Sequence, residues 1–270
     1  MILIADSGST KTDWRLIDGE TISQFETIGL NPFVVSSKVI DETVSQLNLD
    51  FSSINKVFFY GAGCGSTEKA NAFKKVLKTI FTYAEIDVKS DLLAVAHALL
   101  HNNSGVVGIL GTGSNVAYYD GENIKPVKPS LGYLLGDEGS GNYVGKQFLK
   151  LYLTDSLDAD LDKEIKIDKD TILDELYEHS FPNLYLASFC KILFPLRSHP
   201  QIAKIFLDAF EEWIRVYLLP QNIMRIHLSG SIAYYFSAEL KVCCYKNGIT
   251  IESIVKKPIS ALTLFHIKNQ

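Results

Sequence analysis

The segment "IADSGSTKTDW" (residues 4–14) joins an apolar run to a turn of small and hydroxyl residues. Residues 1–5 are typical of a buried strand, and residues 12–18 alternate between apolar and polar before an Asp-Gly pair that favours a hairpin. Residues 21–28 predict a further strand. The chain is therefore expected to begin as strand, turn, strand, turn, strand.

The same plan occurs a second time later in the chain. An apolar strand at 106–110 leads into "GTGSN" (111–115), a strand at 116–119 follows, and Asp120-Gly121 turns it. This is a duplication of a supersecondary unit, which differs from a short-period repeat array.

The remaining periodicity predicts helices alternating with strands, and so an α/β fold. In the first half we expect helices over 36–47, 67–82 and 91–101, with strands at 56–60 and 85–89. In the second half we expect helices over 140–153, 169–179, 185–194, 200–219 and 231–246, strands at 225–228 and 249–254, and a helix from 258. The charge-rich stretch 155–170 is expected to form a surface loop.

Composition limits the function classes. A chain of 270 residues can form one large domain or two ordinary ones. The net charge of −5 argues against nucleic acid or an anionic membrane as the main partner. We expect no signal peptide, because Asp6 ends the N-terminal apolar run, and no apolar run approaches the ~20 residues of a membrane helix. Its four cysteines form no C-x-x-C pair, which favours reduced thiols in a cytoplasmic protein.

Three glycine turns follow apolar strands, at 6–10, 111–115 and 229–231. Glycine lets backbone amides approach a ligand closely, and Ser and Thr add hydroxyl donors, an environment that suits phosphate oxygens. The P-loop pattern is absent, because Ser140 stands where its first glycine should be and Gln147 follows Lys146. The dinucleotide G-x-G-x-x-G pattern is absent as well.

The order of these turns resembles a known superfamily. "IADSGSTKTDW", "GILGTGSN" and "LSGSIA" are similar to the two phosphate motifs and the adenosine motif of actin-like ATPases and sugar kinases. "GTGSN" followed by "GYLLGDEGSG" (132–141) resembles the N-acetylglucosamine kinase and BadF/BadG/BcrA/BcrD ATPase family. The resemblance runs from residue 4 to about 235.

The resemblance implies two ribonuclease H-like α/β domains with a cleft between them. Residues 1–105, joined by a terminal helix at 258–270, would form the N-terminal domain, and residues 106–257 the C-terminal domain. It also implies ATP and Mg²⁺ as cofactors, a small-molecule sugar as substrate, and a homodimer.

The resemblance implies a role for each residue of this sequence that matches the family's nucleotide site. Asp6 would hold Mg²⁺, although a turn-capping role is its plain alternative. The phosphates would be bound by Ser9, Thr10, Lys11, Gly111, Thr112 and Gly113, and the adenosine by Gly230 and Ser231. Lys11 fits a solvated hairpin charge equally well, and the turn at Gly230 fits a plain helix cap.

Asp91 is the expected catalytic base, because the matching acid of the resembling kinases takes the proton of the sugar hydroxyl. Its alternative is simpler: Ser90 caps the helix and Asp91 suits the helix dipole. The resemblance implies that the substrate contacts are Asn31, Asp91, Ser114, Asn115 and Asp137. Glu138 would orient the glycines of the next helix.

The expected function is an ATP-dependent kinase of an amino sugar, N-acetylglucosamine or a related sugar such as N-acetylmuramic acid. Where the family's sugar kinases have Gly-Gly-Trp-Gly, this sequence has Pro129, Ser130, Leu131 and Gly132, so only the last glycine is kept and the identity of the sugar stays open. Alternatives are a BadF/BadG-type ATPase without sugar kinase activity and a nucleotide- or sugar-binding regulator. Iron–sulfur activators need cysteines that the chain lacks between 65 and 189.

Overall fold

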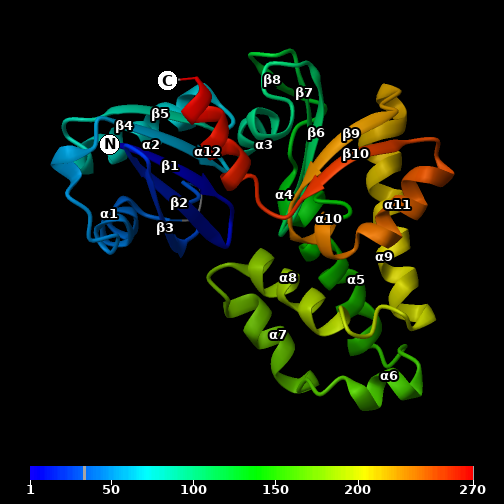
Figure 1. Cartoon of the computed structure of the whole chain (residues 1–270). Coiled ribbons are helices and arrows are strands. Elements are labelled where there is room, and N and C mark those ends of the chain that lie inside the picture. The colour runs from blue at the N-terminus through cyan, green and yellow to red at the C-terminus, as the bar shows by residue number, and fades with distance from the viewer. Residues whose placement is uncertain (33–34, 270) are drawn as a thin grey trace. The chain divides into compact units, whose positions relative to one another are not determined.

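The computed structural model describes residues 1–32 and 35–269, which form two compact units (Figure 1). Unit 1 contains the described residues of Met1–Ser104, Tyr119–Ile124 and Lys257–Gln270. Unit 2 contains Gly105–Tyr118 and Lys125–Lys256.

The short segment Tyr119–Ile124 falls in unit 1, whereas the sequence-based division placed it in the C-terminal domain. The Tyr119 hydroxyl lies 2.9 Å from the carbonyl oxygen of His101 and 2.8 Å from that of Gly121. These contacts tie the segment to the end of the helix that precedes it.

Unit 1 is built on a five-stranded sheet with the order β3-β2-β1-β4-β5. Its strands are β1 (Ile2–Ser7), β2 (Lys11–Asp18), β3 (Thr21–Ile28), β4 (Lys56–Gly61) and β5 (Glu85–Ser90). The central strand β1 is antiparallel to β2 and parallel to β4. The predicted strand–turn–strand–turn–strand beginning is confirmed.

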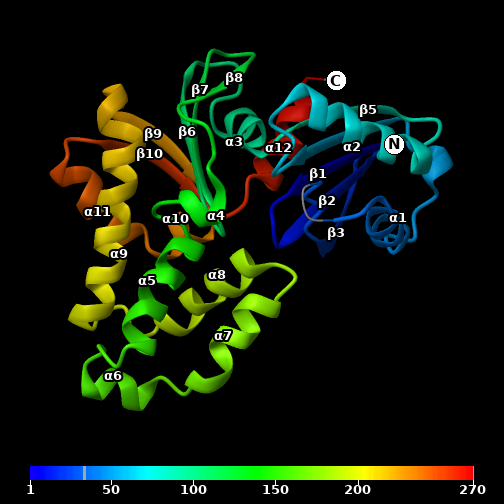
Figure 2. The same cartoon turned by 180° about the vertical axis from the view of Figure 1, so that it is seen from behind.

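Helices cover both faces of this sheet. They are α1 (Ser37–Ser45), α2 (Thr67–Ile80), α3 (Asp91–Leu99) and α12 (Ile259–Lys268), with a short 3₁₀ turn η1 (Phe51–Ser53). Leu3 and Ala5 of β1 share a core with Ile40 of α1 and Phe73 of α2. Because side chains alternate along a strand, the intervening positions face the other side. There α3 and α12 pack against each other (Figures 1 and 2).

Tyr60 of β4 holds α3 and α12 together. Its hydroxyl lies 3.0 Å from His97 Nδ1 of α3 and 3.0 Å from His266 Nε2 of α12. The His97 ring stacks on Phe265 and the His266 ring on Phe58. Burial lowers the pKa of both imidazoles to about 4, so both are neutral at pH 7. The C-terminal helix is thus fixed to unit 1 by a buried polar bridge.

Unit 2 carries a second five-stranded sheet with the order β10-β9-β6-β7-β8. Its strands are β6 (Gly105–Leu110), β7 (Ser114–Tyr119), β8 (Ile124–Pro126), β9 (Arg225–Ser229) and β10 (Thr250–Val255). Read from the β8 edge, the strands follow one another in the same sequence order as those of unit 1 from the β3 edge. The duplicated pattern therefore corresponds to a duplicated sheet topology.

The helices of unit 2 form one core with that sheet. They are α4 (Gly132–Leu135), α5 (Gly141–Leu153), α6 (Ala159–Glu164), α7 (Lys169–Glu178), α8 (Pro182–Leu193), α9 (Pro200–Trp213), the π-helical η2 (Ile214–Leu218), the 3₁₀ turn η3 (Leu219–Gln221), α10 (Ser231–Tyr235) and α11 (Ser237–Lys246).

Two expectations for this half were wrong in detail. The single helix expected over 231–246 is interrupted at Phe236, whose buried ring stacks on Phe206 at 3.8 Å and whose backbone leaves the helical region. The expected loop at 155–170 contains α6, which is anchored by the buried Leu161. In both places long-range packing overrides the local pattern.

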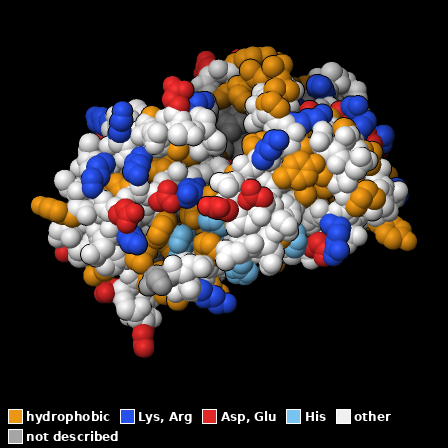
Figure 3. Space-filling model, turned by 90° about the horizontal axis from the view of Figure 1, so that it is seen from above, with side chains coloured by type: hydrophobic (Ala, Val, Ile, Leu, Met, Phe, Trp, Pro, Cys, Tyr) orange, Lys and Arg blue, Asp and Glu red, His pale blue; other side chains and the backbone are white. Residues whose placement is uncertain are grey.

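On the face shown in Figure 3, Lys and Arg side chains lie among Asp and Glu side chains. None of the helices in the described part of the chain is long and apolar enough to cross a membrane. The four cysteines are buried and form no disulfide.

Replacing Tyr60 by Phe should lower the free energy of unfolding by about 1–3 kcal/mol, because both buried imidazoles lose a hydrogen-bond partner. Chemical denaturation at pH 7 measures this. The exposed Tyr83, in the same unit, provides the control Tyr83→Phe, which should change stability little. Equal effects of the two substitutions would contradict the role of the bridge.

Candidate functional site

Two acidic residues meet in unit 1. Asp6 lies near the end of β1, and Asp91 is the first residue of α3. Burial, together with the charges of Asp91 and Asp13, raises the pKa of Asp6 to about 7, while Lys257 acts in the opposite sense. Burial raises the pKa of Asp91 to about 6. Perturbed carboxylates of this kind gather at functional sites.

The helix cap and the acid are separate features. Ser90 is the N-cap of α3, and its hydroxyl accepts a hydrogen bond from Leu93 N at 3.3 Å. Asp91 Oδ1 accepts from Leu92 N at 2.9 Å. Ser90 as the cap and Asp91 in the first turn agree with the simpler alternative, in which the acid suits the helix dipole. The role of Asp91 as a base stays a prediction.

The turn after β1 is closed by its own backbone. Gly8 N donates to Lys11 O at 3.0 Å, which leaves Ser9 and Thr10 at the tip. Below the tip, the buried Ser7 and Thr12 hydroxyls lie 2.8 Å apart. These contacts hold the predicted phosphate turn rigidly on the sheet.

Gly29 fixes this turn from outside, a role that the sequence analysis missed. A Cβ atom at Gly29 would lie 2.4 Å from Gly8 O and 2.5 Å from Ser9 O. Gly29 N also donates to Thr10 O at 3.0 Å. Only glycine allows so close an approach. The expected substrate residue Asn31 stands two positions later, and its carbonyl accepts from Val35 N.

Lys11 extends from β2 and forms an ion pair with Glu26 of β3. Its side chain is largely exposed. The contact with Glu26 is that of a hairpin charge, and phosphate binding by Lys11 stays a prediction.

In unit 2, the second expected phosphate turn is closed by Gly111 N, which donates to Gly113 O at 3.0 Å. The N-terminal residues of α5 pack against it: Gly141 N donates to Gly111 O at 2.8 Å, and Asn142 N donates to Thr112 O at 3.0 Å. The backbone hydrogen bonds therefore join the "GTGSN" and "GDEGSG" segments into one local cluster.

Asp137 lies at the centre of this cluster, where it contacts Ser114 of one segment and Asn142 beside the other. It is buried, with a positive φ of 60°. Its carboxylate accepts from Asn142 Nδ2 at 2.8 Å and from Ser114 N at 3.3 Å, and burial still raises its pKa. A Cβ atom at Gly113 would lie 2.9 Å from this carboxylate. Asn115 turns towards the backbone, where its Oδ1 accepts from Val116 N.

The third glycine turn packs against the second. Gly230 has a φ of 116°, and a Cβ atom there would lie 2.3 Å from Leu110 O and 3.1 Å from Gly111 N. Ser231 begins the short helix α10. The expected adenosine residues thus adjoin the expected phosphate residues within unit 2.

Several buried polar groups surround Asp137 that the sequence analysis did not identify. The Asn142 Oδ1 and Trp213 Nε1 atoms are buried and have no hydrogen-bond partner in the described parts of the chain. The Tyr217 hydroxyl lies beside Ser114 and Glu138, and burial raises the pKa of Tyr217 to about 12. Tyr217 belongs to the π-helical segment η2, and such segments often occur at functional sites.

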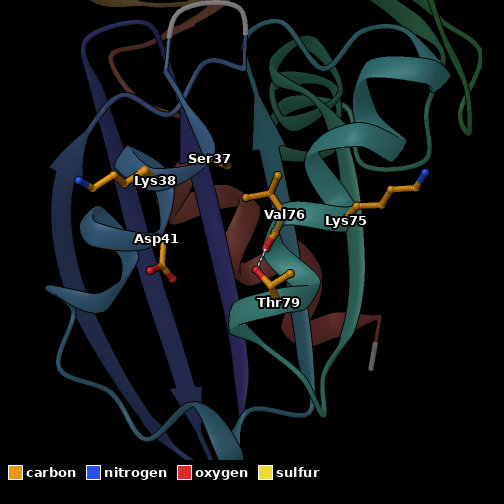
Figure 4. A pocket seen from close by; sticks show the side chains of 6 residues that line it. All are labelled: Ser37, Lys38, Asp41, Lys75, Val76 and Thr79. Atoms are coloured by element: carbon orange, nitrogen blue, oxygen red, sulfur yellow. Dashed lines mark hydrogen bonds between the residues drawn. The ribbon is translucent and has the colours of Figure 1, made fainter.

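A surface groove between α1 and α2 lacks these features (Figure 4). It is lined by Ser37, Lys38, Asp41, Lys75, Val76 and Thr79. Thr79 Oγ1 donates to Val76 O of its own helix at 2.8 Å. The residues predicted to bind nucleotide or sugar are not part of this groove.

The carboxylate oxygens near Asp6 in unit 1 suit a hard divalent cation as ligands. Mg²⁺ prefers carboxylate oxygens and keeps several waters. The half-buried Asp6 carboxylate has no hydrogen-bond donor in the described residues, and Asp91 and Asp13 add negative charge beside it. Asp6 therefore fits a water-mediated Mg²⁺ ligand.

The sequence profile of the BadF/BadG/BcrA/BcrD ATPase family matches residues 5–268. This chain belongs to that family. A comparison with curated protein sequences gave no match.

Solved structures place this BadF/BadG/BcrA/BcrD family member among sugar kinase-like folds. A Porphyromonas gingivalis protein named "Putative N-acetylglucosamine Kinase" is 33% identical with a TM-score of 0.92, covering 100% of this chain and 99% of that one. A Chromobacterium violaceum protein of the same name has 17% identity and a TM-score of 0.68, covering 98% of each chain. The protein MamK has 12% identity and a TM-score of 0.52, covering 99% of this chain and 98% of that one. The predicted fold of two ribonuclease H-like, actin-like ATPase domains is confirmed.

Replacing Gly29 by Ala should displace the turn at residues 8–10 and weaken nucleotide binding about tenfold or more, since the new Cβ cannot fit against Gly8 O. Titration with a fluorescent ATP analogue measures the affinity. Gly65 has open space around its Cβ position, so Gly65→Ala is the control and should bind normally. Normal binding by Gly29→Ala would contradict the constraint.

The raised pKa of Asp6 predicts a pH-dependent cost to stability. Between the usual value of ~4 and about 7 the folded state binds more protons than the unfolded state, so stability falls as pH rises. Asp6→Asn should therefore raise the melting temperature of the metal-free protein at pH 8 and change it little at pH 5.

Thermal melts at the two pH values test this, with the exposed Asp18→Asn as the control. Mg²⁺ should stabilise the wild type at pH 8 more than Asp6→Asn. A lower melting temperature of Asp6→Asn at pH 8 would refute the prediction.

Proposed function

We propose that this protein is an ATP-dependent sugar kinase that transfers the γ-phosphate of ATP to a hydroxyl of an amino sugar. The proposed substrate is N-acetylglucosamine or a related sugar such as N-acetylmuramic acid. The observation that carries the proposal is the pair Asp6 and Asp91, two acids with raised pKa values at a strand end and a helix start. Family membership and the name of the 33% identical structure support the same reaction class.

In this proposal Asp91 accepts the proton of the attacking sugar hydroxyl. A carboxylate with a pKa of about 6 is ionised at neutral pH and basic enough to align the hydroxyl. Phosphoryl transfer otherwise needs positioning and charge stabilisation, and bound Mg²⁺ would supply part of the latter. The sugar would be held by Asn31, Ser114, Asn115 and Asp137, whose buried neighbours offer further polar atoms.

The turns supply the nucleotide contacts. Ser9, Thr10 and Lys11 in unit 1 and Gly111, Thr112 and Gly113 in unit 2 would donate to phosphate oxygens. Gly230 and Ser231 would contact the adenosine. The close glycine packing supports this assignment, because it keeps backbone groups in fixed positions. The cytoplasmic location and the homodimer stay predictions.

Asp91→Asn should lower phosphotransfer about 10²–10⁴-fold, because the proton acceptor is lost, while ATP binding remains. A coupled ADP-release assay with a panel of amino sugars measures this. Asp87 lies on the preceding strand, where it pairs with Lys89 at 3.3 Å, so Asp87→Asn is the matched control and should remain active.

The sugar panel also separates the alternatives. ATP hydrolysis that no sugar stimulates would favour an ATPase without sugar kinase activity. Nucleotide or sugar binding without turnover in the wild type would favour a regulator. Either result would refute the kinase proposal.

A further inference from the structure

Three carboxylates stand in one row across the sheet of unit 1. Asp6 of β1 is directly opposite Asp13 of β2, and Asp13 is directly opposite Glu26 of β3. Directly opposed residues project from the same face of a sheet at close spacing, where like charges destabilise it. The row therefore works against the stability of the sheet and needs a compensating cation.

Lys11 pairs with Glu26 at one end of the row, and the cation at Asp13 is Lys257. Its ammonium nitrogen lies 2.8 Å from Asp13 Oδ1 and 3.2 Å from Glu26 Oε2. The Asp13 side chain is 13% exposed and that of Lys257 is 40% exposed, so this ion pair is partly shielded from water.

The position of Lys257 follows from the fold. It stands two residues before α12, which packs on α3 and contacts β1 and β2. The bridge between Tyr60 and His266 fixes that helix further along. The packing of the C-terminal helix α12 on unit 1 therefore places Lys257 next to the carboxylate row.

We propose that Lys257 is an internal counter-cation that keeps divalent cations from the Asp6–Asp13 pair while no nucleotide is bound. The inference rests on the proposed function, because Asp6 is the residue expected to hold Mg²⁺. A fixed positive charge beside Asp6 opposes a second cation by Coulomb repulsion and occupies an oxygen of Asp13 that could otherwise bind it. Lys257 is a positioning residue in this scheme.

The consequence is an order of binding. With Lys257 in place, the carboxylate row is a poor site for a free divalent ion, and the ion arrives already bound to the triphosphate. Without Lys257, Asp13 becomes available next to Asp6, and the pair should bind a divalent ion by itself.

The test is the affinity of the nucleotide-free, full-length protein for Mn²⁺, followed by the electron paramagnetic resonance signal of the free ion. Lys257→Met should bind Mn²⁺ about tenfold or more tightly than the wild type. Lys257→Arg keeps the charge and should bind as weakly as the wild type. The double variant Lys257→Met/Asp13→Asn should lose the gain.

Lys256 supplies the matched control. It is the adjacent lysine, and its ammonium lies over the Tyr235 ring at 4.8 Å. Lys256→Met makes the same change in net charge and should leave Mn²⁺ affinity unchanged. Circular dichroism and thermal melts confirm that each variant is folded.

A gain in Lys257→Met no larger than that in Lys256→Met would overturn the proposal. A gain that survives in the double variant would also overturn it, because Asp13 would not be the uncovered ligand. The measurement needs neither ATP nor sugar. Failure of the kinase proposal would appear instead in the sugar panel, so the two failures are distinguishable.

Discussion

The sheet and the helices of unit 1 hold two acidic side chains where water is scarce. Asp6 and Asp91 lie partly buried at the end of the central strand and the start of α3, and both have raised pKa values. Such an arrangement is unfavourable in itself, because desolvation and repulsion both penalise the ionised forms. The surrounding structure has to impose it, through the rigid sheet below and the helix that begins at Ser90.

Glycine packing provides the same kind of constraint for the turns. Gly29 against Gly8, and Gly230 against Leu110, bring backbone segments closer than any side chain would allow. The two contacts occur in different units, yet each presses on the turn that follows a central strand, β1 or β6. The supporting glycines follow strands at different places of the duplicated topology, Gly29 after β3 and Gly230 after β9.

The sequence was most informative where the pattern was local. Strand alternation, Asp-Gly turns and the glycine turns predicted both sheets and the order of the motifs. It failed at Phe236 and at residues 159–164, where buried packing partners far along the chain decide the backbone. Asn142, Trp213 and Tyr217 could not be identified as site residues either, because only the fold brings α5, α9 and η2 to the segment around Asp137. The proximity of Lys257 to Asp13, 244 residues away, likewise has no local signal.

The long separation in sequence between Lys257 and Asp13 affects how the lysine is held in place. A lysine near the acids in sequence would follow every local movement of the β1–β2 turn, whereas Lys257 is held by α12 and its buried contact with Tyr60. The charge that balances Asp13 is therefore set by docking of the C-terminal helix, and the electrostatics of the acid row depend on an intact unit 1. The helix that returns from the end of the chain completes the sheet's charge balance as well as its packing.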